Sequence, residues 1–225
     1  MSAVLRYQRR GELLPRIRPS FDDSWDEWKG RWWFLGSNPL HRLFIAIPLP
    51  RVQKEWLSHW SRLLSERWSF KKWVHPSDYH ITLQFLGPCT FRQGREVKKA
   101  LKELVPQMDP FSLRIDGLGT FGVPHRPRIL WAGVGGDRKT LHQLYSAVTD
   151  TVEPLGFQRE KRSYRPHITL AKKYKYNDFP HETLEEHFRT DPAVCEWTVR
   201  ELVLYETHIY RSPMYHPLAT FRLGE

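Results

Sequence analysis

The sequence predicts an α+β fold in which helices and strands alternate along most of the chain. Apolar residues recur at helical spacing in three segments, and short β-branched or aromatic runs bounded by Gly and Pro lie between them. A repeated tetrapeptide also suggests two related lobes. With 225 residues, 40% of them hydrophobic, the chain can build one large domain or two lobes around a substantial core.

The individual elements follow from periodicity and from the residues that interrupt it. Strands are expected at residues 43–49, 79–86, 111–115, 128–134, 167–171, 197–207 and 214–221. Helices are expected at 52–64, 97–105 and 141–152, with a short one at 183–188. Pro48 and Pro50 end the first strand, Gly87-Pro88 is expected to stop the second, and Gly156 follows the third helix.

Residues 1–40 differ in composition from residues 41–225, which we expect to form the folded domain with its two lobes. Four tryptophans and several arginines fall in this extension, and Ser24 to Glu27 has the pattern of a helix-capping box. We interpret it as an appended segment that docks its tryptophans on the main body or on a partner. A start codon placed too far upstream is a third reading. The first residues lack the apolar stretch of a secretory signal.

Charge and cysteine content exclude several classes of protein. Lys and Arg number 35 against 25 Asp and Glu, a net charge of +10 that favours polyanions such as nucleic acid, although a solubilising surface explains it equally well. The two cysteines, Cys89 and Cys195, argue against a disulfide scaffold and for a reducing, cytoplasmic setting. No apolar run is long enough for a membrane span, and no common metal-binding motif is present.

The most informative feature is a letter-for-letter duplication. His80-Ile81-Thr82-Leu83 recurs as His167-Ile168-Thr169-Leu170, and each copy opens a predicted strand. Side chains alternate between the faces of a strand, so the His and Thr of each copy point one way and the two apolar residues point to the core. If two lobes face each other about a pseudo-two-fold axis, two imidazoles and two hydroxyls meet in one cleft.

Such a group of side chains suits phosphoryl chemistry without a metal. An imidazole has an ordinary pKa of about 6.5, so at neutral pH one ring can act as a base while the other acts as an acid. Placed on opposite sides of a phosphorus, they can deprotonate the attacking oxygen and protonate the leaving oxygen, while the hydroxyls bind the non-bridging oxygens. A single His-x-Thr on a strand is more often structural. Two copies in matching contexts favour a functional pair.

These residues resemble the two-histidine (2H) phosphoesterases, whose signature is a pair of HxT motifs. Further stretches are similar to the RNA 2′,3′-cyclic phosphodiesterase branch, also called 2′-5′ RNA ligases, from about residue 42 to 222. They are FIAI at 44–47, WV at 73–74 through HITLQFLG, GLGTFGVPHRPRILWAGV, LGFQREKRSYRPHITLAKKY, LYE at 204–206 and PMY at 213–215. The extension of residues 1–40 departs from this pattern and leaves open whether the groove is covered or lengthened.

The resemblance implies a bilobal fold in which two antiparallel sheets line a central basic cleft, with helices outside. It also implies hydrolysis of an RNA-terminal 2′,3′-cyclic phosphate to a 2′-phosphomonoester, without cofactor or metal. His80 would be the proton donor to the 3′ oxygen, His167 the proton acceptor that activates water, and Thr82 and Thr169 would hold phosphoryl oxygens. The symmetry of the motifs alone does not choose between acid and base. The expected partner is RNA with such an end, and tRNA halves are one candidate. The protein is expected to be a monomer that does not bind membranes.

Several further residues are candidates for binding substrate. A phosphate could be bound bidentately by an arginine of the RPR segment, Arg128 or Arg126. A terminal base could stack on an aromatic ring beside the motifs: Tyr79, Tyr164 or Phe121. An exposed surface arginine and ordinary aromatic packing are the corresponding structural alternatives. We interpret His75, His125 and His208 as loop or solvent histidines.

Other activities stay open on the sequence alone. The same site could act on small cyclic nucleotides such as ADP-ribose 1″,2″-cyclic phosphate, or cleave 2′-5′ linkages. It could also run the reverse ligation, with an RNA 5′-hydroxyl in place of water. A catalytically idle RNA-end-binding protein would use the same groove without needing an acid and a base, and a tryptophan-mediated scaffold would depend on residues 21–34 instead.

Overall fold

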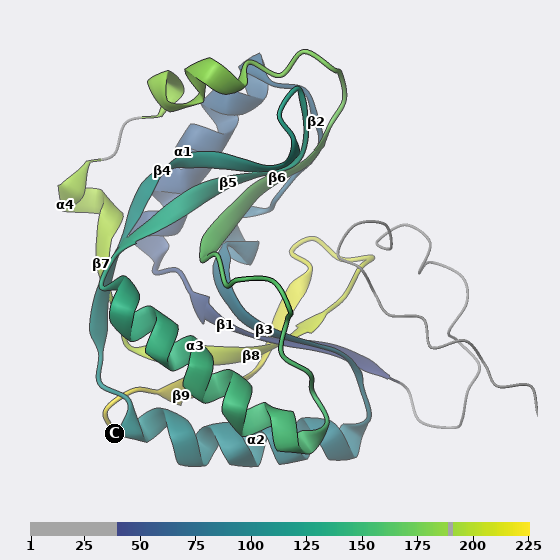
Figure 1. Ribbon diagram of the computed structural model, residues 1–225, viewed down its shortest axis with the longest axis vertical. Helices are drawn as coiled ribbons and strands as arrows, with labels where there is room; N and C mark the ends of the chain where they lie inside the picture. The colour runs from purple at the N-terminus through teal and green to yellow at the C-terminus, as the bar shows by residue number, and fades with distance from the viewer. Residues whose placement is uncertain (1–39, 189–190) are drawn as a thin grey trace, which may run out of the picture. The chain divides into compact units, whose positions relative to one another are not determined.

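The computed structural model describes residues 40–188 and 191–225, which form two antiparallel sheets with helices packed on them (Figure 1). This confirms the α+β class and the two-sheet arrangement expected from the resemblance. The predicted capping box at Ser24–Glu27 and its tryptophans lie outside the described residues. The division into an extension and a domain therefore stays a prediction.

The two sheets have four and five strands, and every pair of neighbouring strands is antiparallel. The first has the order β3 (His80–Cys89), β1 (His41–Pro48), β8 (Glu201–Thr207), β9 (Tyr215–Arg222). The second has the order β2 (Phe70–Trp73), β6 (His167–Tyr174), β5 (Arg126–Gly136), β4 (Phe111–Val123), β7 (Glu196–Val199). The helices are α1 (Arg51–Arg67), α2 (Phe91–Leu104), α3 (Arg138–Val152) and α4 (Pro192–Cys195).

The two lobes are not successive halves of the chain. Each sheet takes strands from both halves, and α3, which follows β5 of the five-stranded sheet, lies beside α2 and contacts β3 of the other sheet (Figure 1). In the same way α1 follows β1 but contacts β2 and α4. One continuous hydrophobic core joins residues of both sheets. The two HxT copies nevertheless open strands of different sheets, β3 and β6.

The apolar run of β1 shows how the core and the opposite face divide. β1 lies between β3 and β8, so both of its edges are hydrogen-bonded to neighbouring strands. Leu43, Ile45 and Ile47 belong to the main core, whereas Phe44 and Ala46 form a separate small cluster on the other face. Helix α2 covers the core face, where Gly94 approaches Leu43. His80 lies on the Phe44 side, away from α2.

Several predicted strand boundaries are wrong; the strand expected at 111–115, for example, is β4, which runs on to Val123. Gly87-Pro88 does not stop β3, which continues to Cys89. β3 is the edge of its sheet, where a missing proline N–H costs little, and Gly87 adopts a positive φ of 72° beside a register shift in the β1–β3 pairing. Thr90 follows the strand and caps α2 with a reciprocal Gln93 contact.

The predicted strand at 197–207 is two strands, β7 and β8, which separate at Arg200 and join different sheets. The prediction joined them because both are apolar and β-branched, and local composition does not name a partner strand. The segment expected as a short helix at 183–188 is a 3₁₀ helix, His181–His187. The four-residue strand β2 was not predicted at all.

Candidate active site

His80 is the first residue of β3, directly after a 3₁₀ turn at Pro76–Asp78. Its Nδ1 lies 2.7 Å from the Asp78 carbonyl oxygen, and its Nε2 lies 3.0 Å from Thr82 Oγ1. A carbonyl can only accept, so Nδ1 carries a hydrogen and donates it. This fixes the tautomer and leaves Nε2 of the neutral ring as the basic nitrogen, accepting from the Thr82 hydroxyl.

Aromatic rings enclose His80. Phe44 and Tyr215 have ring centroids 4.9 and 5.1 Å from it, and Tyr205 lies at 6.1 Å. This burial lowers the pKa of His80 to about 4; the Asp78 carbonyl opposes the shift, and the positive charge of Lys172 adds to it. In the absence of substrate the His80 imidazole is therefore neutral at pH 7.

Asp78 supports His80 through its main chain and a neighbouring loop through its side chain. The carboxylate is 4% exposed and accepts hydrogen bonds from the backbone amides of Met214 (2.8 Å) and Tyr215 (3.1 Å). The same residue thus holds the His80 ring and places Tyr215 against it. The sequence analysis did not identify Asp78, because a lone Asp in a turn usually serves only the turn.

His167 opens β6 in a similar way but with different neighbours. Its Nδ1 lies 2.8 Å from the Arg165 carbonyl oxygen, so here too Nε2 is the basic nitrogen. Phe121 packs edge-on at 4.9 Å and Trp131 lies at 6.3 Å. Burial lowers the pKa of His167, the Arg165 carbonyl opposes this, and Lys172 adds to it.

A glycine explains how Trp131 reaches this position. Gly119 of β4 lies directly opposite Trp131 of β5, and a Cβ added at Gly119 would lie 2.2 Å from the indole ring. The ring therefore occupies the space that a side chain at 119 would fill. Thr169, half-buried, pairs with Trp131 from the other side.

The two HxT motifs come together between the sheets. The Tyr164 hydroxyl, three residues before His167, donates to the Thr82 carbonyl across 3.2 Å. Tyr164 is itself stacked on Tyr145 of α3, with ring centroids 4.0 Å apart and planes 2° from parallel. The imidazoles are close enough for the charge of His167 to lower the pKa of His80. Tyr164 is thus a link between the motifs, and its predicted contact with a base stays untested.

Lys172 is a cation of the site that the sequence analysis missed. It pairs with Lys72 of the edge strand β2, and its charge reaches both histidines. Burial lowers the pKa of Lys172, and Lys72 lowers it further. Strict alternation from His167 would place Lys172 on the opposite face. A register shift between Leu130 and Trp131 of β5 breaks that alternation.

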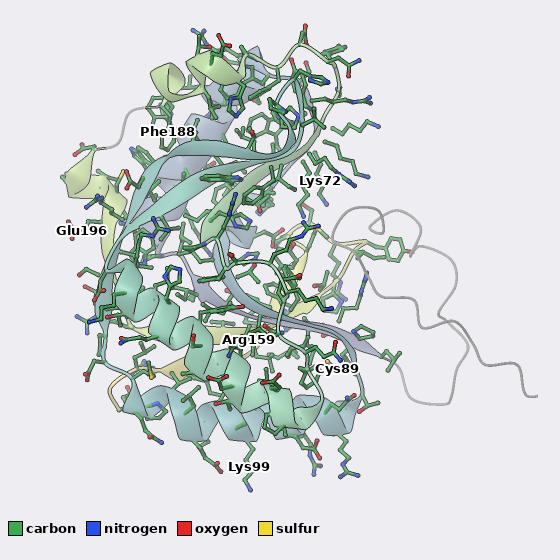
Figure 2. The ribbon with its side chains drawn as sticks, viewed as in Figure 1. Lys72, Cys89, Lys99, Arg159, Phe188 and Glu196 are labelled. Atoms are coloured by element: carbon green, nitrogen blue, oxygen red, sulfur yellow. The ribbon has the colours of Figure 1, made fainter. Side chains whose placement is uncertain are left out.

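The two lysines border a hollow of about 100 Å³ next to His80, which Asp78 and Tyr215 also line. Lys72, labelled in Figure 2, has its Nζ 2.9 Å from Met214 Sδ. Like charges directly opposite on a sheet destabilise it. An anion between the lysines and the histidines would remove this repulsion, so the site favours a negatively charged group.

The remaining predicted residues have different surroundings. Tyr79 is 1% exposed and its hydroxyl lies 2.8 Å from Ser61 Oγ, so it packs in the core and cannot offer its ring to a base. Arg126 and Arg128 are exposed at the start of β5. Phe121 contacts His167 directly. Phosphate binding by the arginines and base stacking by Phe121 stay predictions.

Residues 40–188 and 191–225 hold neither a grouped set of metal ligands nor a helix suited to a membrane. Within these residues, no three or more His, Cys, Asp or Glu side chains are grouped so that they could hold a metal ion. Among the described helices, none has the length and apolar character needed to cross a bilayer.

Comparison with known proteins places this arrangement in a family. The model of the 2′-5′ RNA ligase superfamily matches residues 49–210, which include both HxT strands. The chain belongs to this superfamily.

Curated members of the superfamily are similar over most of the described chain. An RNA 2′,3′-cyclic phosphodiesterase from Geobacillus stearothermophilus is 38% identical over 181 residues, which are 80% of this chain and 56% of that protein. One from Bacillus subtilis is 36% identical over 157 residues, 69% of this chain and 82% of that protein. The chain thus spans just over half the length of the first relative. The crystal structure of E. coli LigT in apo form shares the fold, with a TM-score of 0.65 at 24% identity, covering 83% of this chain and 99% of LigT.

Proposed function

We propose that this member of the superfamily hydrolyses RNA-terminal 2′,3′-cyclic phosphodiesters to 2′-phosphomonoesters, with His80 as proton donor and His167 as proton acceptor. The observation that carries the proposal is the convergence of the two HxT motifs from different sheets, held by the Tyr164–Thr82 hydrogen bond. Curated relatives with the printed name RNA 2′,3′-cyclic phosphodiesterase support the substrate. Simple binding of an RNA end does not require two imidazoles that can exchange protons with the substrate.

The proposed reaction breaks one P–O bond and forms one. His167 Nε2 takes a proton from water as the water oxygen attacks phosphorus, and the bond from phosphorus to the ribose 3′ oxygen breaks. His80 Nε2–H gives its proton to that oxygen, leaving a 3′-hydroxyl and a 2′-phosphate. His167 then returns its proton to solvent and His80 regains one. An RNA 5′-hydroxyl in place of water would give 2′-5′ ligation by the same steps.

The charge on phosphorus has two kinds of partner in this site. Thr82 and Thr169 stand two residues after the histidines on the same strands and offer hydroxyl donors to the non-bridging oxygens. Lys172 supplies a positive charge beside both rings. Because these groups are already fixed by the sheets, they need little rearrangement as charge develops.

The lowered pKa of His80 has a direct consequence for its role as donor. With a pKa of about 4, the ring must gain its proton when the substrate binds. The cyclic phosphodiester is an anion, and a negative charge next to an imidazole favours its protonated form. Substrate binding therefore prepares the acid, while the Asp78 carbonyl keeps Nε2 directed at the reacting atoms.

Product analysis tests the proposal. The protein, in EDTA, is incubated with a short RNA ending in a 2′,3′-cyclic phosphate, and the terminal phosphate is identified. We expect a 2′-phosphate from the wild type and from His59→Ala, a control that removes an exposed histidine of α1. His80→Ala and His167→Ala should yield none at matched times. Binding of the RNA without turnover by the wild type would refute the proposed activity and favour an end-binding protein.

A further inference from the structure

The loop that joins β8 to β9 is fixed against the His80 motif. The amide of His208 donates to the Met214 carbonyl across 2.7 Å and closes the loop, and the amide of Arg211 donates to the His208 carbonyl across 3.0 Å within it. The Asp78 carboxylate binds the end of the loop through the amides of Met214 and Tyr215. A loop held at both ends in this way is a defined surface next to the active site.

Two hollows meet at this loop. The first is the 100 Å³ hollow beside His80 and Lys172, and the second has a volume of about 380 Å³. Arg211, Ser212 and Tyr215 line both, so the two are adjacent. The second is completed by His208, Pro213 and His216. Because the Tyr215 ring is 5.1 Å from the His80 ring, the second hollow begins one side chain away from the proposed proton donor.

The second hollow has the chemistry of a phosphate and base subsite. Arg211 is exposed and offers a guanidinium fork that suits a phosphodiester, and His208 and His216 add ring nitrogens. Glu206 holds His208 in place, with Oε2 3.2 Å from its Nε2, and also binds His41. Tyr210, next to Arg211 in the loop, is 78% exposed. An exposed ring beside a basic hollow is typical of surfaces on which single-stranded bases stack.

The proposed positions of the proton donor and the attacking water indicate which part of the substrate lies at the β8–β9 loop. His80 protonates the 3′ oxygen, which belongs to the terminal ribose, whereas the attacking water lies on the His167 side. The ribose and the RNA attached to it must therefore leave the site past His80. The β8–β9 loop is on that side, in contact with His80 through Tyr215.

We propose that the hollow of His208, Arg211 and His216 binds the phosphodiester on the 5′ side of the terminal nucleotide, and that Tyr210 stacks on a neighbouring base. This inference rests on the proposed function and narrows its substrate class. The protein then prefers a single-stranded oligoribonucleotide of about two or three nucleotides or more over a cyclic mononucleotide.

The test compares kcat/KM for a nucleoside 2′,3′-cyclic phosphate and for a trinucleotide with the same cyclic end. The wild type should prefer the trinucleotide by about tenfold or more, since a charged hydrogen bond to phosphate and a base stack each contribute on this scale. Arg211→Ala should lower that preference by about tenfold, and Tyr210→Ala by about fivefold. Arg95→Ala, which removes an exposed arginine from α2 on the core face of the sheet, should leave the preference unchanged.

A salt titration adds a second readout. If Arg211 contacts a phosphate, its loss should reduce the slope of log kcat/KM for the trinucleotide against log salt by about 1. Equal turnover of both substrates by the wild type, or an unchanged preference in Arg211→Ala, would overturn the subsite while leaving the proposed hydrolysis intact. Failure of the wild type to open either substrate would instead overturn the proposed function, and the subsite with it.

Discussion

His80 and His167 stand in identical tetrapeptides but in different surroundings. Both are the first residue of a strand, and both donate from Nδ1 to the carbonyl two residues earlier. Three aromatic rings from β1, β8 and β9 enclose His80, and an aspartate behind it also anchors a loop. His167 has Phe121 and Trp131 as its neighbours.

The difference shows what a local motif does and does not determine. The tetrapeptide places an imidazole and a hydroxyl on one face of a strand, and the carbonyl two residues before each histidine makes Nε2 the basic nitrogen. The protonation of each ring depends on what the rest of the chain packs around it. Burial lowers both pKa values, and that of His80 reaches about 4. A symmetric repeat can therefore place two imidazoles in unequal electrostatic surroundings.

Separating the two proton transfers gives the largest expected effects. On an RNA cyclic phosphate, His80→Ala and His167→Ala should each lower kcat by about 10²–10⁴-fold. On bis(p-nitrophenyl) phosphate, whose nitrophenolate leaves without a proton at neutral pH, the loss in His80→Ala should shrink to less than about tenfold. His167→Ala should keep its full loss, because water must still be activated. The reverse pattern would exchange the two roles.

The positive charge of Lys172 lowers the pKa of both histidines, so its removal should raise both pKa values together. Lys172→Met is expected to lower kcat/KM roughly 10²-fold through lost stabilisation of the phosphoryl charge. The wild-type kcat/KM profile should peak below pH 6.5, because both histidine pKa values are lowered in the free enzyme. Loss of the cation raises both values, so the variant's peak should move to higher pH. Lys99→Met, on the outside of α2 (Figure 2), is the control, and a shift of equal size there would contradict the role of Lys172.

Asp78 tests whether the support behind His80 matters to chemistry as well as folding. Asp78→Ala leaves two buried amides without their acceptor, so the free energy of unfolding should fall by about 2–4 kcal/mol. At a temperature where the variant is folded, kcat should fall about tenfold, because Tyr215 no longer holds the His80 ring. Asp78→Asn, which keeps one acceptor oxygen, should recover part of the free energy of unfolding and part of kcat. Asp109→Ala removes an exposed carboxylate and should change neither. Loss of stability with full kcat would leave Asp78 a purely structural residue.

The sequence could predict features that depend on neighbours along the chain. The HITL strands and the three long helices follow from side-chain periodicity, and the α+β class follows from their order. Features that depend on distant partners were missed. Lys172 faces the site only because the β5–β6 pairing passes over Leu170 of β6, and β2 is too short to show a period. Tyr79 looked available because it adjoins His80, but adjacent residues of a strand face opposite ways, and its ring points into the core.

The smallest expected effect concerns the link between the two motifs. Tyr164→Phe removes the hydroxyl that donates to the Thr82 carbonyl but keeps the stack on Tyr145. The free energy of unfolding, measured by urea denaturation, should fall by about 1 kcal/mol. The kcat should fall by about threefold, because the separation of the histidines is less firmly fixed.

Tyr174→Phe is the matched control for this link. Its hydroxyl donates to Asp178 across 3.1 Å, away from both histidines. We expect a loss of stability no larger than that of Tyr164→Phe, and an unchanged kcat. If kcat fell equally in both variants, general loosening of the fold would explain the effect. If kcat fell only in Tyr164→Phe, the hydrogen bond from the segment before β6 to the Thr82 carbonyl of β3 would be a positioning contact for the histidine pair.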